Sequence, residues 1–147
     1  MKLTEEVKEK IKTENKLWVN AYGNKTMEER KKLGAFYTPA DLIIEMIECL
    51  DKIDPDEDYE DCCAGSGNIL AALMIAGVEP EHIFCNELDE DTLSIAHNRL
   101  NELSMKLYGR MIPLSHFRHE DALEEKAYFT DITEPKKTFL DKFGDVE

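Results

Sequence analysis

Apolar residues recur every three or four positions along several charged segments of the chain, a pattern that predicts amphipathic helices. These helices are expected over residues 3–20, 40–52, 90–107 and 134–147. A capping box predicts a further short helix over 26–32, and a continuous apolar run predicts one over 68–76. The residues expected to line the buried faces of three of the amphipathic helices are Leu3, Val7, Ile11, Leu17, Trp18, Leu42, Ile43, Met46, Ile47, Leu50, Leu93, Ala96, Leu100, Leu103 and Leu107. His97 lies one step off the last of these apolar stripes and is expected to be partly exposed.

Short apolar runs bounded by turn residues predict β-strands between these helices. The strands are expected over residues 58–62, 82–86, part of 112–119, and 126–132. Gly77 ends the helix over 68–76, and Val78-Glu79-Pro80 turns the chain toward the second strand. Strands alternating with helices predict an α/β fold with a parallel sheet.

The first strand and the following helix are joined by Asp61-Cys62-Cys63-Ala64-Gly65-Ser66-Gly67-Asn68-Ile69-Leu70. Gly65 and Gly67 lack a Cβ, so they can adopt left-handed backbone angles and let a ligand approach the backbone closely. The free N–H groups at the start of the helix offer donors and partial positive charge to an anionic group. Gly-x-Gly by itself is equally compatible with a tight turn that binds nothing.

Acidic residues follow two of the predicted strands. Glu87 ends the second strand, 26 positions after Asp61, where an acid can accept hydrogen bonds from both hydroxyls of a ribose. Asp121 ends the third strand. The carboxyl ends of parallel strands share one edge of a sheet, so this placement favours a binding role over plain surface charge.

Phe36-Tyr37-Thr38-Pro39 precedes the helix over 40–52. Thr38 is predicted as its N-cap, Pro39 suits the first helical position, and Asp41 is placed to close a capping box. A well-started helix explains these residues without any ligand. An aromatic pair just before a cap is nevertheless costly to expose unless it contacts something.

Composition narrows the class of protein. The 147 residues include 18 basic and 32 acidic side chains, a net charge of −14, so weak or no DNA binding is expected from the chain alone. Its four cysteines form no C-x-x-C pair, which predicts reduced thiols in an intracellular protein. The four histidines form no familiar ligand spacing with these cysteines, so no metal site is expected. No apolar run is long enough for a membrane span, and a cytoplasmic location is expected.

Taken together, these motifs resemble the cofactor-binding half of S-adenosylmethionine-dependent N6-adenine DNA methyltransferases, notably type I modification subunits of restriction-modification systems. The resemblance implies a Rossmann-like class I methyltransferase fold with a truncated sheet of order 3-2-1-4, preceded by N-terminal helices. It implies S-adenosylmethionine as cofactor, with its methionine end bound near Phe36-Tyr37-Thr38-Pro39. Glu87 would then accept hydrogen bonds from the ribose, Leu88 would lie against the adenine ring, and Asp121 would accept a hydrogen bond from the adenine amino group. The cofactor-binding residues it implies are Phe36, Tyr37, Thr38, Asp61, Cys63, Ala64, Gly65, Gly67, Asn68, Glu87, Leu88, Asp121 and Ala122.

The sequence also departs from this family. Cys62 replaces a usual proline, and the Asn/Asp-Pro-Pro-Tyr/Phe motif that polarises and stacks on the target base is absent, since the chain has no Pro-Pro. Ile132-Thr133-Glu134-Pro135-Lys136 stands at about the expected distance. No catalytic residue is therefore assigned. Three hypotheses follow: a cofactor-binding protein inactive alone, a methyltransferase subunit or fragment completed by another chain, or an acidic interaction module or DNA mimic without cofactor.

The domain organisation expected is an N-terminal helical segment over residues 1–33 and a methyltransferase-like domain over 34–147. A sheet that stops after its fourth strand would leave residues 128–132 as an exposed edge. Exposed edges invite pairing. We therefore expect a homodimer or a partner subunit that covers this edge.

Overall fold

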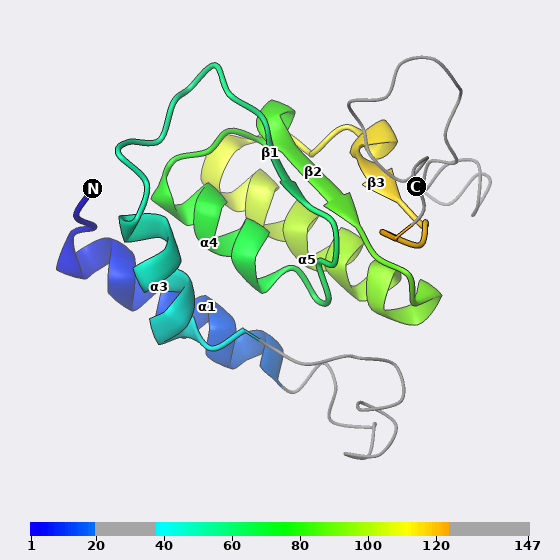
Figure 1. The fold of residues 1–147 in the computed structure, drawn as a ribbon, viewed down its shortest axis with the longest axis horizontal. Coiled ribbons are helices and arrows are strands. Elements are labelled where there is room, and N and C mark those ends of the chain that lie inside the picture. The colour runs from blue at the N-terminus through cyan, green and yellow to red at the C-terminus, as the bar shows by residue number, and fades with distance from the viewer. Residues whose placement is uncertain (20–37, 124–147) are drawn as a thin grey trace.

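The computed structural model describes residues 1–19 and 38–123 (Figure 1). Its helices are α1 (Glu5–Val19), α3 (Ala40–Glu48), α4 (Asn68–Ala76) and α5 (Glu90–Tyr108), and its strands are β1 (Tyr59–Asp61), β2 (Ile83–Asn86) and β3 (Phe117–Arg118). Two short 3₁₀ helices, η2 (Pro80–His82) and η3 (Leu114–His116), lead directly into β2 and β3. The helices predicted over 26–32 and 134–147 and the strand over 126–132 lie outside the described residues.

The three described strands form a parallel sheet in the order β1-β2-β3. Tyr59 pairs with Ile83, and Cys85 of the central strand pairs with Phe117. This arrangement confirms the predicted α/β fold and its 3-2-1 strand order. All three carboxyl ends therefore meet at one edge, where Asp61, Asn86 and the residues after Arg118 lie.

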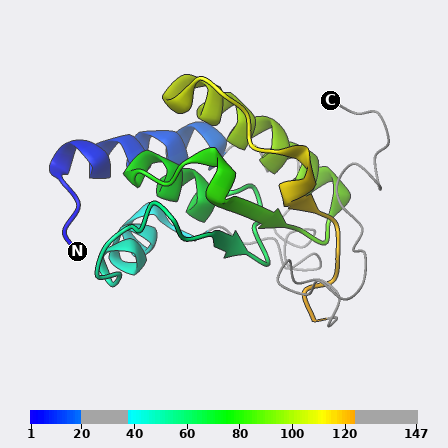
Figure 2. The same cartoon turned by 90° about the horizontal axis from the view of Figure 1, so that it is seen from above.

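Helix α4 is the central helix of the molecule. It packs on β1 and β2 and also contacts α1, α3 and α5 (Figure 2). Such a helix must be apolar on most of its surface. Its buried apolar residues are Leu70, Ala71, Ala72, Leu73 and Met74. Gly77, with φ of 123°, ends it as predicted.

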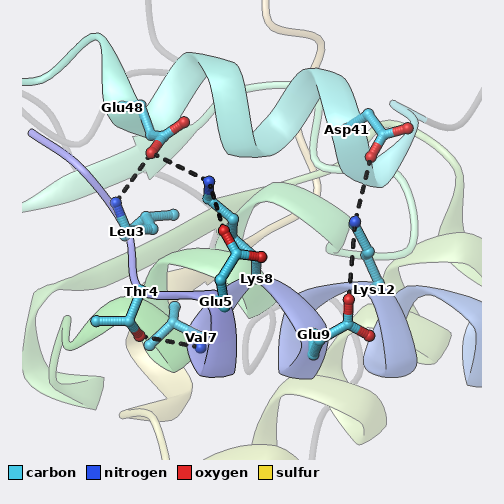
Figure 3. Close-up of polar contacts among 9 residues, drawn as sticks. All are labelled: Leu3, Thr4, Glu5, Val7, Lys8, Glu9, Lys12, Asp41 and Glu48. Carbon is cyan, nitrogen blue, oxygen red and sulfur yellow. Dashed lines mark hydrogen bonds and ion pairs between the residues drawn. The ribbon is translucent and has the colours of Figure 1, made fainter.

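Helix α1 packs against α3 and α4 on the side of the molecule away from β3 (Figure 1). Leu3 and Ile11 are buried as predicted, whereas Leu17 is 67% exposed and was wrongly placed in the core. Figure 3 shows the polar contacts that join α1 to α3: Lys8 Nζ lies 3.8 Å from a Glu48 carboxylate oxygen, and Lys12 Nζ lies 3.9 Å from one of Asp41. Ion pairs this open to solvent stabilise by at most about 1 kcal/mol each. The buried apolar side chains therefore hold α1 in place.

Helix α3 differs from its prediction in its cap, its length and its buried face. Pro39, not Thr38, occupies the N-cap position, no side chain caps the helix, and it ends at Glu48. Ile43, Ile44 and Ile47 are buried, whereas Leu42 and Met46, both predicted as core residues, are 48% and 44% exposed. Among the described elements, α3 packs mainly against α1 and α4, so a single narrow face is buried.

Helix α5 begins with Asp89, whose carboxylate accepts a hydrogen bond of 3.0 Å from the Thr92 amide. Its predicted stripe is buried except at Leu107, which is 39% exposed. His97 was predicted to be partly exposed but is buried, because Phe117 of β3 packs edge-on against its ring at 4.8 Å. Burial lowers the pKa of His97 below its ordinary value.

Three further findings concern the cysteines, possible metal ligands and membrane spans. All four cysteines are free thiols. Within residues 1–19 and 38–123, no group of three or more His, Cys, Asp and Glu side chains is arranged to hold a metal ion. No helix in the same residues is long and apolar enough to cross a membrane.

Candidate functional site

The glycine turn between β1 and α4 adopts the backbone that only glycine accepts easily. Gly65 and Gly67 have φ of 57° and 90°, both in the left-handed region, as predicted. The Ala64 amide donates to the Asn86 carbonyl at 2.9 Å, which ties the turn to the end of β2. A Cβ on Gly67 would lie 3.2 Å from the side chain of Leu100, so α5 also packs closely behind the turn.

Asn86, which was missed as a site residue, joins the ends of all three strands. Its side chain is 1% exposed. Its Nδ2 donates to the carbonyls of Cys62 at 2.8 Å and Glu120 at 3.0 Å, and its Oδ1 accepts from the Glu120 amide at 3.1 Å. A polar residue ending an apolar strand, just before an acid, was the sequence signal for this role.

Glu87 lies directly on the glycine turn. Its Oε1 accepts a hydrogen bond of 2.9 Å from the Gly65 amide, and its Oε2 accepts one of 2.8 Å from the Asp89 amide. Two residues 22 positions apart in the sequence are thus in direct contact. Leu88, the next residue, is 60% exposed at the same edge.

Two more acids from the predicted site end or follow strands at the same edge of the sheet. Burial raises the pKa of Asp61, the hydrogen bond from the Cys63 amide opposes this rise, and the charge of Glu87 adds to it. Asp121 follows β3, and its carboxylate accepts from the Leu123 amide at 3.0 Å. The pKa of Cys63 is raised by desolvation and then by the negative charge of Asp61, Glu87 and Asp121. The negative charge of all three carboxylates thus acts on the same thiol at this edge of the sheet.

The adjacent thiols are poor nucleophiles in this setting. Desolvation, followed by the carboxylate of Glu60, raises the pKa of Cys62 to about 11. Both Cys62 and Cys63 therefore stay protonated at neutral pH, and a thiol is far less reactive than a thiolate. The arrangement suits binding through backbone amides and carboxylates rather than covalent catalysis.

The side chain of Asn68 points into the protein, toward α5. Its Oδ1 accepts a hydrogen bond of 2.5 Å from Nη1 of Arg99, and its Nδ2 donates to the Thr38 carbonyl at 3.4 Å. Arg99 is 1% exposed and also bonds to the Ser66 carbonyl at 3.2 Å. A basic residue inside an apolar helical stripe was the signal for this contact, and it was overlooked in the sequence.

The described residues enclose a cavity of about 30 Å³ at the turn, with room for about one water molecule. It is lined by Thr38, Asp61, Cys63, Ala64, Gly65, Ser66, Asn68 and Ile69. A nucleoside-sized ligand would therefore have to lie across the edge of the sheet rather than inside this cavity. Ala122 lies just beyond the edge next to Asp121, while Phe36 and Tyr37 lie outside the described residues.

Residues 20–136 match the protein family described as N-6 DNA Methylase. The chain belongs to the N-6 DNA methylase family. The match covers well over half of the chain and includes the glycine turn, Glu87 and Asp121. It confirms the resemblance that these motifs predicted.

Two proteins similar to this member of the N-6 DNA methylase family illustrate the relationship. A stretch of 74 residues is 34% identical to Type II methyltransferase M.VspI of Vibrio sp. (strain 343), covering 50% of this chain and 18% of that protein. The fold is similar to a chain in the cryoEM structure of a DrdV–DNA complex, with a TM-score of 0.61 and 23% identity over 82% of this chain and 14% of that chain. The second likeness supports the fold alone. The matched part of the chain thus covers less than a fifth of the length of each of these two proteins.

Proposed function

We propose that this chain binds S-adenosylmethionine across the carboxyl edge of its parallel sheet, as the cofactor-binding part of an N6-adenine DNA methyltransferase. The observation that carries the proposal is the 2.9 Å hydrogen bond between the Gly65 amide and Glu87. The glycine turn and the ribose-binding acid are the two most distinctive elements of the resemblance. They lie in contact at the edge where ligands of open α/β sheets bind.

The chemistry of the residues fits this cofactor. A carboxylate has about four lone-pair sites. Glu87 uses two of them on the Gly65 and Asp89 amides, so acceptor capacity remains for two ribose hydroxyls. Asp121, three residues after β3, would accept from the adenine amino group. The negative charge gathered from Asp61, Glu87 and Asp121 also suits a cationic sulfonium.

The turn itself would hold the opposite end of the cofactor. Gly65 and Gly67 present backbone without side chains, and the first turn of α4 carries N–H groups that favour a carboxylate. S-adenosylmethionine supplies an activated methyl group for in-line displacement. The residues of this chain would orient it and exclude water, which is where positioning contributes most.

We further propose that the chain alone does not transfer the methyl group. Its sequence has no Pro-Pro, so the Asn/Asp-Pro-Pro-Tyr/Phe motif that polarises the target amine is missing. A longer protein or a second chain would supply that motif, the DNA-recognition surface and the partner for the sheet edge. The net charge of −14 agrees with this division, because it opposes DNA binding by this part on its own.

Titration calorimetry with S-adenosylmethionine tests the proposal. The unaltered chain should show one saturable site, and Glu87→Gln should weaken it about tenfold or more, because hydrogen bonds to a charged acceptor contribute roughly 1.5–3 kcal/mol. Glu102→Gln, on the exposed side of α5, is the matched control and should change nothing. Absence of binding would favour an acidic interaction module instead. Transfer of a labelled methyl group from S-adenosylmethionine to DNA by the chain alone would contradict the proposal that it is inactive by itself.

A further inference from the structure

The guanidinium of Arg99 is buried between helix α1 and the glycine turn. On the α1 side, its Nε donates to a carboxylate oxygen of Glu14 at 3.2 Å, and its central carbon lies 5.6 Å from the centre of the Trp18 ring. On the turn side, its Nη1 donates to the Ser66 carbonyl at 3.2 Å and to Asn68 Oδ1 at 2.5 Å. One side chain thus connects two segments about 50 positions apart in the sequence.

A guanidinium this deeply buried needs both sets of partners. Arg99 is 1% exposed, and Glu14, whose side chain is 14% exposed, supplies a negative charge against it. Removing one member of a buried ion pair is strongly destabilising because it leaves the other charge uncompensated. The position of α1 therefore influences where the guanidinium lies, and the guanidinium in turn restrains the turn.

The residues held by Arg99 flank the most constrained point of the turn. Ser66 and Asn68 lie on either side of Gly67, which is the N-cap of α4 and has φ of 90°. Leu100, the neighbour of Arg99 on α5, packs where a Cβ of Gly67 would lie. The two consecutive α5 residues thus support the turn from behind.

We infer that Arg99 is a positioning residue through which helix α1 sets the affinity of the glycine turn for the amino-acid end of the cofactor. The inference rests on the proposed function. Displacement of α1, by substitution or by a partner, removes Glu14 from Arg99 and relaxes the turn. The contacts to the nucleoside end would be made by Glu87 and Asp121, which follow other strands, and Glu87 bonds to the turn at Gly65 rather than at Ser66 and Asn68, the two residues that Arg99 holds.

Two ligands separate a positioning role from a merely structural one. S-adenosylmethionine carries the amino-acid part, whereas 5′-methylthioadenosine has the same nucleoside without it. By calorimetry, Glu14→Ala and Arg99→Lys should each weaken S-adenosylmethionine binding about tenfold. Glu14→Ala removes the partner of Arg99 on α1, and the lysine of Arg99→Lys lacks the forked guanidinium that reaches both α1 and the glycine turn. Binding of 5′-methylthioadenosine should change less than about twofold. Glu14→Gln, which can still accept from Nε, should recover most of the lost affinity.

Arg110→Lys is the matched control, because Arg110 is exposed and pairs with Glu79 and Glu81 away from the turn. Equal losses for the two ligands, or no loss in Glu14→Ala, would overturn the inference while leaving the proposed function standing. If circular dichroism shows that Arg99→Lys does not fold, the comparison of Glu14→Ala with Glu14→Gln tests the inference instead. If the unaltered chain binds neither ligand, the proposed function fails and this inference fails with it.

Discussion

Replacing Asn86 with alanine should destabilise the protein by about 2–3 kcal/mol, because the side chain connects three strand ends in a buried place. The change removes the hydrogen bonds to the Cys62 carbonyl and to both backbone groups of Glu120. A typical net contribution is about 1 kcal/mol for each bond. Cys62 and Glu120 are only half-buried, so water can reach some of the backbone groups that lose their partner. The total loss therefore stays near the sum of the three hydrogen bonds.

Urea unfolding followed by far-ultraviolet circular dichroism measures this change. A loss of about 2–3 kcal/mol is a large share of the 5–15 kcal/mol by which a domain of this kind is usually stable. Asn98→Ala, at an exposed position of α5, is the control of the same residue type; it loses one hydrogen bond with His97 and should shift the free energy of unfolding by no more than about 1 kcal/mol.

A second substitution separates hydrogen bonding from packing. Asn86→Asp keeps the size and the acceptor oxygen but loses both donated bonds and adds a charge near Asp61 and Glu87. It should therefore destabilise at pH 7 at least as much as Asn86→Ala. A loss below about 1 kcal/mol in Asn86→Ala, or an Asn86→Asp variant as stable as the unaltered protein, would refute the reasoning.

Three further predictions concern the turn and its acids. Gly65→Val should abolish cofactor binding in calorimetry, because a branched side chain is strained at φ of 57° and obstructs the backbone; near-normal affinity would count against the turn as the site. Asp121→Ala should weaken binding less, by about 1.5–3 kcal/mol, and a loss equal to that of Gly65→Val would contradict its role. Asp61→Asn should stabilise the protein at pH 7. The pKa of Asp61 is raised in the folded protein, so its negative charge costs stability once the pH exceeds the ordinary pKa of 3.8. Urea unfolding of the variant should therefore show a gain in stability at pH 7 and none at pH 3.

Local rules explain why the core of the site was predictable from sequence. Only glycine occupies left-handed angles easily, so Gly65 and Gly67 identified the turn. Strands separated by a helix run parallel, so their ends had to share one edge, which placed Glu87 beside the turn. The bounds of α4 followed from Asn68 and Gly77 in the same way.

The residues that were missed or misplaced depend on contacts between distant segments. His97 is buried because Phe117 covers a second side of α5, which helical periodicity does not reveal. Leu42 is exposed because it lies off the face of α3 that α1 and α4 bury in the described part of the chain. Arg99 and Asn86 gain their roles from partners on α1, the turn and the three strand ends. A single helix or strand carries no information about such partners.

Titration of the ¹⁵N-labelled chain with S-adenosylmethionine, followed by nuclear magnetic resonance, tests the proposed binding edge most directly. The amide signals of Gly65, Gly67 and Glu87 should shift together and saturate at one equivalent of ligand. The signal of Lys106, on the exposed side of α5, should stay in place. Unchanged glycine signals at saturating ligand, or shifts confined to residues of α1 and α3, would contradict binding at the carboxyl edge of the sheet.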